Sequence, residues 1–302
     1  MFDVLGLGCV AVDDLVYVEA FPLADAKTPV LRTARYCGGL TGTALVAAAR
    51  LGSKCAYAGV VGEDELSAFA IQRLGAEGID LSHMLRCAGA GPVHSFIVVD
   101  EQRGTRNIFF DSSKAAGADE KSPEAALIQS ARVLFVDTFG LKGMIRAAQI
   151  ARTAQVPVVA DFERGQGPEF RELFELVDHL ILSQTFACGI ASTPDPAEAA
   201  KRLWTKQRQA VVVTCGAQGC WYFDETIGLK HQPAFKVKAV DTTGCGDVFH
   251  GAYAAMLARE MSLPERIHFA SAAAALKATQ PGGQSGIPSR PAVESFLSEE
   301  TL

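Results

Sequence analysis

The sequence predicts an α/β protein: one domain over residues 1–302, built on a doubly wound, mostly parallel sheet with a small β-sheet lid. Short β-branched runs alternate with amphipathic stretches along most of the chain. Several runs, such as 133–136 and 211–213, are apolar throughout, which is typical of parallel strands covered on both faces. Two stretches, at about 15–36 and 94–110, are strand-like without a convincing helix, so we expect them to form the lid.

The elements follow in chain order, with ligands expected at the carboxyl ends of the strands. The opening stretch carries Asp3 among apolar residues and has no basic segment, so it is expected to be a first strand and not a signal peptide. Core strands are predicted at 3–8, 56–61, 133–137, 156–161, 179–183 and 210–214. Helices are predicted at 42–51, 66–77, 142–153, 196–207, 248–260 and 264–279. Lid strands are predicted at 16–18, 30–35, 95–99 and 106–110.

Composition narrows the function classes. Apolar residues make up 49% and charged residues 21% of the chain, as in ordinary soluble proteins. No apolar run approaches the ~18 residues that a membrane span requires. The net charge of -6 argues against a nucleic-acid partner, since phosphates favour basic surfaces. The cysteines form no CxxC pair, so we expect reduced thiols in a cytoplasmic protein that binds neither membrane nor nucleic acid.

The most informative segment is Asp-Thr-Thr-Gly-Cys-Gly-Asp at 241–247, directly before the predicted helix at 248–260. Gly244 and Gly246 allow a sharp turn and the close approach of a large ligand. The backbone N–H groups at a helix start, including that of Cys245, favour an anion such as a phosphate. These three residues are therefore predicted to hold a transferring phosphoryl group.

Asp247 follows this turn and is predicted to be the catalytic base. An alcohol that attacks a phosphoryl group must lose its proton, and a carboxylate placed beside it can accept that proton. The alternative is structural: Asp247 would only stabilise the start of the helix, and Gly244 and Gly246 would only form the turn.

Residues 240–257 closely resemble the second signature of the PfkB carbohydrate kinases, the ribokinase-like superfamily, with Cys245 where alanine is commonest. Gly38-Gly39, followed by 47–52 and 59–64, resembles the first signature. The resemblance runs from Val4 to Pro288, nearly the whole chain. It implies a ribokinase-like fold and an ATP- and Mg²⁺-dependent kinase that phosphorylates a hydroxyl of a sugar.

On the substrate side, the resemblance implies that Asp13 binds sugar hydroxyls and that Gly38 and Gly39 approach the sugar. Thr43 stands where the family usually has an asparagine, which argues against a ribokinase in the strict sense. Asp137 matches a position that often carries an acidic substrate ligand. A carboxylate that only caps the turn after its strand remains the alternative for Asp137.

On the nucleotide side, Thr214, Gly216 and Gly219 resemble a family turn that packs near the ATP, and Ala275 and Thr279 match the adenine pocket. The family's NxxE motif is missing: Ser183 and Phe186 occupy its two places. The resemblance there is to ketohexokinases and sulfofructose kinases, and Mg²⁺ would be carried by the nucleotide through waters. Asp241 and Thr243, with carbonyl groups near 280–283, match a monovalent cation site, which implies potassium dependence.

The motifs most resemble those of sulfofructose kinases and ketohexokinases. Lys27 lies where a sulfofructose kinase has a lysine that faces the anionic end of its sugar, and Arg106 is a second candidate for an anionic group. We therefore expect a keto-sugar or related polyol, anionic in some cases. A nucleoside kinase of the same superfamily and a non-catalytic sugar sensor remain alternatives. The apolar lid strands imply a homodimer through the lid.

Overall fold

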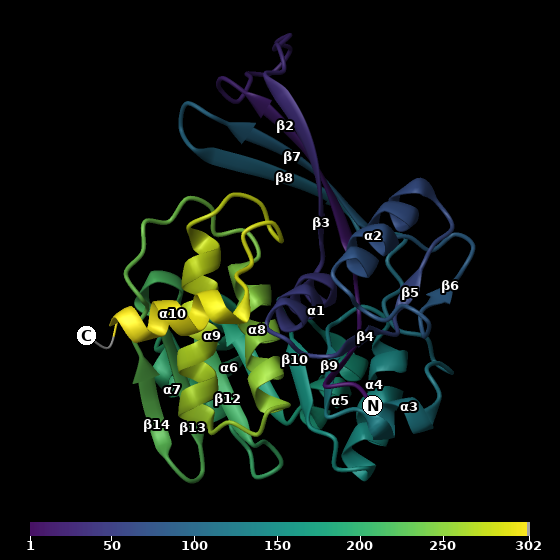
Figure 1. The fold of residues 1–302 in the computed structure, drawn as a ribbon, viewed down its shortest axis with the longest axis vertical. Coiled ribbons are helices and arrows are strands. Elements are labelled where there is room, and N and C mark those ends of the chain that lie inside the picture. The colour runs from purple at the N-terminus through teal and green to yellow at the C-terminus, as the bar shows by residue number, and fades with distance from the viewer. Residues whose placement is uncertain (301–302) are drawn as a thin grey trace.

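The computed structural model describes residues 1–300 of the chain. Its centre is an eight-stranded sheet (Figure 1). Neighbouring strands are parallel from β4 to β12, and an antiparallel hairpin extends the sheet at the other edge. In spatial order the strands are β14 (Gly228–Gln232), β13 (Cys220–Asp224), β12 (Ala210–Thr214), β11 (His179–Ser183), β10 (Val158–Asp161), β9 (Val133–Val136), β1 (Val4–Leu7) and β4 (Cys55–Tyr57).

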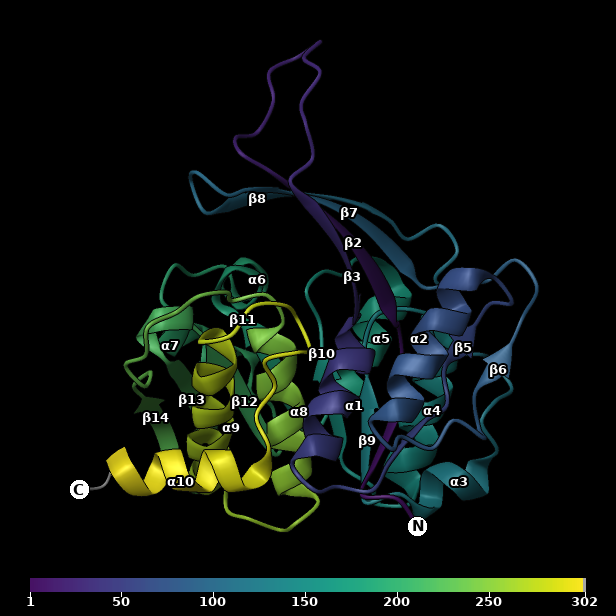
Figure 2. The ribbon, with the colours of Figure 1, turned by 45° about the horizontal axis from the view of Figure 1, so that its top comes forward.

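Helices cover both faces of this sheet (Figure 2). Successive strand residues point to opposite faces, so Val133 and Phe135 of β9 join one apolar core and Leu134 and Val136 join the other. On the first face lie α1 (Leu40–Arg50), α8 (Cys245–Leu257) and α9 (Leu263–Ala278), with α2 (Glu65–Ala76) and α10 (Arg290–Glu300) beside them. The second face is covered by α3 (Ala125–Ser130), α4 (Leu141–Thr153), α5 (Gly167–Leu176), α6 (Gln184–Ala191) and α7 (Pro196–Leu203).

A second sheet, here called the small sheet, stands above the central one (Figure 1). Its strands, in spatial order, are β3 (Arg32–Gly38), β2 (Ala11–Val18), β7 (Val93–Asp100) and β8 (Thr105–Asp111). β2 continues directly from β1, so the small sheet begins at the carboxyl edge of the central sheet. A two-stranded sheet of β5 (Val60–Val61) and β6 (Leu85–Arg86) lies apart from both.

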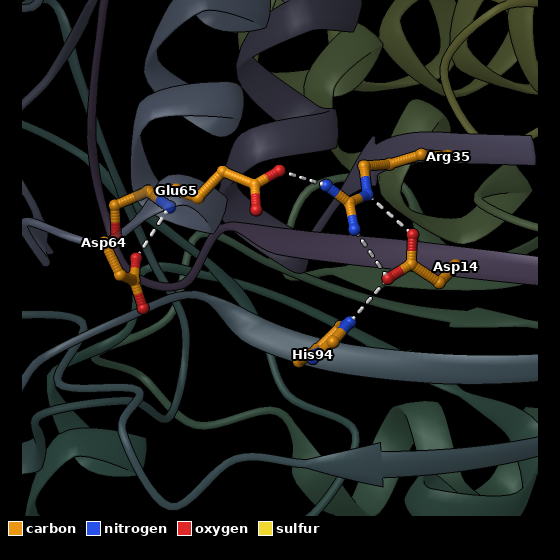
Figure 3. Close-up of polar contacts among 6 residues, drawn as sticks. Asp14, Arg35, Asp64, Glu65 and His94 are labelled. Atoms are coloured by element: carbon orange, nitrogen blue, oxygen red, sulfur yellow. Dashed lines mark hydrogen bonds and ion pairs between the residues drawn. The ribbon is translucent and has the colours of Figure 1, made fainter.

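An ion-pair network holds the base of the small sheet to α2 (Figure 3). The guanidinium of Arg35 on β3 donates two hydrogen bonds to Asp14 on β2, at 2.6 and 3.0 Å, and one to Glu65 at 2.7 Å. His94 on β7 contacts the same Asp14 carboxylate at 2.8 Å. The hydrogen bonds to Asp14 raise the pKa of Arg35, and the guanidinium in turn lowers the pKa of Asp14.

The expected core elements are present with shifted ends. The helix predicted at 196–207 ends at Leu203, and the strand predicted at 56–61 divides between β4 and β5, which lie in different sheets. Residues 19–31, partly predicted as lid strand, contain no strand. The prediction missed the hairpin β13–β14 and the helices α3, α5, α6 and α10. All eight cysteines are free thiols, and no helix among the described residues is long and apolar enough to span a membrane.

Candidate active site

A cleft of about 560 Å³ lies where the carboxyl ends of the central strands face the small sheet. The chain segments that follow β1, β9 and β10 contribute to it, as does the start of α8. The small sheet contributes one face of β2, β7 and β8. The lining residues that concern the chemistry are Asp13, Gly39, Ser95, Arg106, Phe110, Glu163, Arg164, Thr243, Gly244, Gly246 and Asp247.

The floor of the cleft is the start of α8. Gly244 precedes the helix in the left-handed conformation, with φ 76°, and a side chain there would meet the carbonyl oxygen of Gly283 at 2.9 Å. A Cβ at Gly246 would meet open space. The N–H of Cys245 donates to the Thr242 carbonyl at 3.2 Å, and this thiol is not part of the cleft lining. The positive end of the helix therefore faces an open space that suits an anion.

Asp247 lies in the first turn of α8 and faces the cleft. Its carboxyl group interacts electrostatically with that of Asp161, the buried last residue of β10. Burial raises the pKa of Asp247 well above its usual range, and the negative charges of Asp161 and Glu163 raise it further. Two carboxyl groups this close share protons, since both cannot easily be charged together.

His250, one turn further along α8, is buried and connects the start of the helix to the central sheet. Its Nδ1 lies 2.8 Å from the Gly246 carbonyl oxygen and 3.4 Å from Asp161 Oδ2, and its Nε2 lies 3.1 Å from the Ile181 carbonyl oxygen. Burial lowers the pKa of His250, whereas the two carbonyl contacts raise it. The ring thus ties the turn at Gly244–Gly246 to β10 and β11.

Asp13 enters the cleft from β2, opposite the start of α8. Burial raises the pKa of its carboxyl group, while a hydrogen bond from the Ser95 side chain lowers it. Gly38 packs beside Asp13, where an added Cβ would lie 2.9 Å from Oδ2. Gly39 has φ 90° and packs on the backbone of Val10, which a side chain would meet at 2.6 Å. The structure therefore brings Asp13, Gly38 and Gly39 together beside the N-terminus of α1.

Other predicted substrate residues lie away from the cleft lining. Asp137 is fully buried, and its oxygens accept hydrogen bonds from the N–H of Cys9 at 2.7 Å, the N–H of Phe139 at 2.8 Å and the hydroxyl of Thr41 at 2.9 Å. Burial raises the pKa of Asp137 to about 6. These contacts favour the alternative in which Asp137 fixes the turns after β1 and β9.

Thr43 and Lys27 also lie outside the cleft lining. Thr43 is buried in α1, where its hydroxyl accepts a hydrogen bond from Gln284 at 3.2 Å. Lys27 lies exposed in the 19–31 segment at the far end of the small sheet. Arg106 of β8 does line the cleft, and its guanidinium lies 3.5 Å from Asp241 Oδ1.

Comparison with known proteins shows which family the chain belongs to. Residues 6–290 match the pfkB family of carbohydrate kinases. The chain belongs to the PfkB carbohydrate kinase family. It is 31% identical to a ribokinase of Haemophilus influenzae over 86% of this chain and 87% of that protein. It is 28% identical to fructokinase-1 of Oryza sativa subsp. japonica over 95% of this chain and 94% of that protein.

Among solved structures, the Arabidopsis thaliana ribokinase complexed with ribose and ATP has a TM-score of 0.86 and 22% identity, covering 98% of each chain. That likeness confirms the predicted ribokinase-like α/β fold. Family membership makes the chain a phosphotransferase that acts on sugar hydroxyls.

The predicted nucleotide residues of this carbohydrate kinase lie along the same edge of the sheet, beyond α8. Thr214 ends β12, and its hydroxyl donates to the Leu182 carbonyl at 3.4 Å. Gly216 and Gly219 flank the short turn into β13, both with positive φ. Ala275 and Thr279 lie at the end of α9. Their contact with a nucleotide stays a prediction.

The residues at the two NxxE places do not fit direct ligation of Mg²⁺. The Ser183 hydroxyl accepts the N–H of Phe186 at 3.4 Å and so caps α6, while the Phe186 side chain packs against the core. Within residues 1–300, no group of three or more His, Cys, Asp or Glu side chains is arranged to hold a metal ion.

Sequence reasoning missed several groups in the cleft of the kinase. Glu163 and Arg164 line it just after β10, with the buried Asp161 behind them, and Ser95 lies on β7 opposite Asp13. Arg164 lies with its guanidinium 5.1 Å from the ring centre of Phe110 on the small sheet. The sequence contained a signal for the charged residues at 161–164. They end or directly follow a buried parallel strand, and such positions lie at the ligand-binding edge of the sheet.

Proposed function

We propose that this kinase transfers the γ-phosphoryl group of ATP to a hydroxyl of a keto-sugar or related polyol, with Asp247 as the general base. One observation carries the proposal: Asp13 and Asp247 line the same cleft as the open turn at Gly244–Gly246. A sugar held by Asp13 under the small sheet would lie between that carboxylate and the start of α8. The small sheet would act as its lid.

The chemistry follows from the placement of these groups. Asp247 takes the proton of the attacking hydroxyl, and the backbone N–H groups at the start of α8 receive the charge of the phosphoryl oxygens. The raised pKa of Asp247 makes it a stronger proton acceptor than an exposed carboxylate once it is ionised. Asp13 and the lid orient the sugar, so that one hydroxyl faces Asp247.

ATP would lie from Gly244 toward the turn at Gly216 and Gly219, since these segments share the carboxyl edge of the sheet. Mg²⁺ would be bound by the phosphates and by water, because the two residues at the motif places offer it no carboxylate. The free cysteines are consistent with the reducing cytoplasm, which we propose as the location of the reaction.

The cleft also contains positive charge that would suit an anionic sugar. Arg106 and Arg164 both line it, from the lid and from the end of β10. Lys27 is too exposed in this structure to be part of the lining and would need the 19–31 segment to fold inward. We therefore propose Arg164 with Arg106, before Lys27, as the groups that accept an anionic end of the substrate.

A coupled kinase assay on hexoses, pentoses, keto-sugars and nucleosides tests the substrate class.

Asp247→Asn tests the mechanism: kcat should fall by about 10²–10⁴-fold, because the proton acceptor is lost. ATP binding, measured by calorimetry, should be retained. Unchanged phosphate transfer by Asp247→Asn would contradict the role of the base. Turnover of nucleosides alone would favour a nucleoside kinase, and sugar binding without ATP turnover would favour a sensor.

A further inference from the structure

Lys277 is a fully buried lysine at the end of a helix. It lies in the last turn of α9, where a lysine side chain normally reaches the solvent, yet its exposed fraction is 0%. Its ammonium group donates a hydrogen bond to the main-chain carbonyl of Asp241 at 2.8 Å. A lysine is almost never fully buried without a partner for its charge, so this position requires an explanation.

The surroundings of the ammonium group are the loop that leads into the phosphate-binding turn. Asp241 Oδ1 accepts the N–H of Thr243 at 2.9 Å and lies 3.5 Å from the guanidinium of Arg106. Asp241 Oδ2 accepts the N–H of Gly282 at 2.9 Å. The N–H of Asp241 itself donates to the carbonyl of Ala278 at 3.1 Å. Each oxygen of Asp241 therefore accepts a hydrogen bond, and the donor to its carbonyl oxygen is the charged ammonium group of Lys277.

The resemblance to the PfkB family implies a monovalent cation at Asp241 and Thr243, and these residues do not fit one. A potassium ion requires a cage of oxygen atoms that replaces its water shell. The Asp241 carbonyl oxygen accepts the ammonium group of Lys277, which thereby occupies the place of a cation, and each carboxylate oxygen accepts one N–H group. An added cation would also lie beside a fixed ammonium and a guanidinium, and like charges in a half-buried site repel strongly.

We propose that the ammonium group of Lys277 is a built-in cation that takes the place of a monovalent metal ion and holds the 241–244 loop in its phosphate-binding shape. The inference rests on the proposed function, because it assigns Lys277 to the same phosphate-binding turn. Lys277 is a positioning residue: it acts through Asp241 and does not line the cleft. Phosphoryl transfer by this kinase is then independent of potassium.

The charge has a further effect on the turn itself. Lys277 interacts electrostatically with Cys245 and with Asp247, at the first turn of α8. Its positive charge adds to the helix dipole where phosphoryl oxygens would bind. It also offsets negative charge on Asp247, which would otherwise repel an incoming nucleotide.

The first experiment measures the wild-type kinase in sodium, potassium, caesium and choline chloride at one ionic strength. The rates should agree within about twofold, since a tethered ammonium needs no partner from solution. Thermal unfolding in the same four salts should give the same midpoint. A rate in potassium that is at least tenfold higher than in choline would overturn the proposal.

The second experiment removes the ammonium. Lys277→Ala should lower kcat at least tenfold in choline, and potassium or ammonium ions should restore a large part of the rate in a saturable way. Potassium should also raise the unfolding midpoint of this variant but not that of the wild type. Lys277→Met keeps a long apolar side chain without the charge, and should lose rate without rescue. Lys201→Ala, an exposed lysine in the last turn of α7, is the matched control and should behave as the wild type.

The outcomes separate the inference from the function on which it rests. Lys277→Ala or Lys277→Met with wild-type rates in choline would overturn the inference and leave Asp247 as the base. A loss of rate that no small cation restores in Lys277→Ala would also overturn it, because a purely structural lysine is not replaced by an ion. If Lys277→Ala fails to fold, Lys277→Met and the wild-type salt series decide. If the wild type phosphorylates no sugar, the unfolding midpoints in the four salts still test the inference.

Discussion

The carboxyl pair of Asp161 and Asp247 determines how the active site responds to pH. Burial raises the pKa of both groups, and each is raised further by a neighbouring negative charge. Asp247, as the proposed base, acts only when it is ionised, so activity should fall on the acid side as it takes up a proton. Because the two groups titrate together, the acid limb of the pH–rate profile belongs to the pair.

Asp161→Asn should move that acid limb of kcat/KM to lower pH by about one unit. The substitution removes the charge that disfavours ionisation of Asp247, and its amide can donate a hydrogen bond to the ionised form. The pH profile of kcat/KM between pH 4 and 9 measures the shift. Asp178→Asn is the control: burial also raises the pKa of Asp178, but this residue precedes β11 at the opposite edge of the sheet. An acid limb that stays in place or moves to higher pH in Asp161→Asn would contradict the coupling of Asp161 with Asp247.

At the scale of elements, the arrangement of β2, β3 and α2 decides where Asp13 lies. Asp13 and Asp14 are neighbours on β2 and point to opposite faces of the small sheet. One lines the cleft, and the other is held by Arg35, which also contacts the first residue of α2 (Figure 3). The network therefore fixes the base of the small sheet to α2.

Arg35→Met should raise KM for the sugar by about fivefold, the size expected of a partly exposed ion pair worth roughly 1 kcal/mol. The reason is that Asp13 loses its fixed position when the base of the lid is released, while Asp247 and the turn at Gly244 are untouched. Steady-state kinetics with the sugar varied and ATP saturating measures the effect, and kcat should change less than KM. Arg32→Met removes an exposed ion pair with Glu101 from the same strand, at the end away from the cleft, and should leave KM unchanged. Equal effects of the two substitutions would contradict the assignment.

At the scale of the whole molecule, the two faces of the small sheet have different surroundings. Ile108 and Phe110 point into the cleft, which accounts for their exposed fractions of 49% and 53%. Phe96 and Phe109, paired across β7 and β8, face the other way and are exposed by 52% and 56%. Large exposed aromatic groups on one face are typical of a contact surface, which supports the expected homodimer through the lid.

Phe109→Lys should convert the expected dimer to a monomer, because a buried ammonium without a partner would be costly at the contact. Light scattering coupled to size-exclusion chromatography at working concentrations measures the mass. Ile190→Lys is the control, since this apolar residue is 38% exposed on α6 and is not part of the small sheet. A wild-type protein that is a monomer under these conditions would contradict the prediction.

The local pattern of the sequence was enough to predict the parallel core, the turn at Gly244–Gly246 and the placement of Asp247 in the first turn of α8. These features depend on neighbours along the chain: apolar runs, helical periodicity, and two glycines before a helix. In the missed hairpin β13–β14, β14 is partly exposed and polar, and the apolar run of β13 is only four residues long and lacks β-branched residues.

The tertiary structure alone decided which polar groups meet. It placed Asp161 against Asp247, Lys277 on the carbonyl of Asp241 and Asp137 among donors from three separate segments. Apart from the Phe139 N–H, which lies two residues from Asp137, these contacts join residues between 36 and 128 positions apart along the chain. The sequence determined the residues available at the carboxyl edge of the sheet. Burial and charge in the folded chain then decided which of them face the cleft: Asp137 is fully buried among internal donors, whereas Asp13 and Asp247 line the cleft.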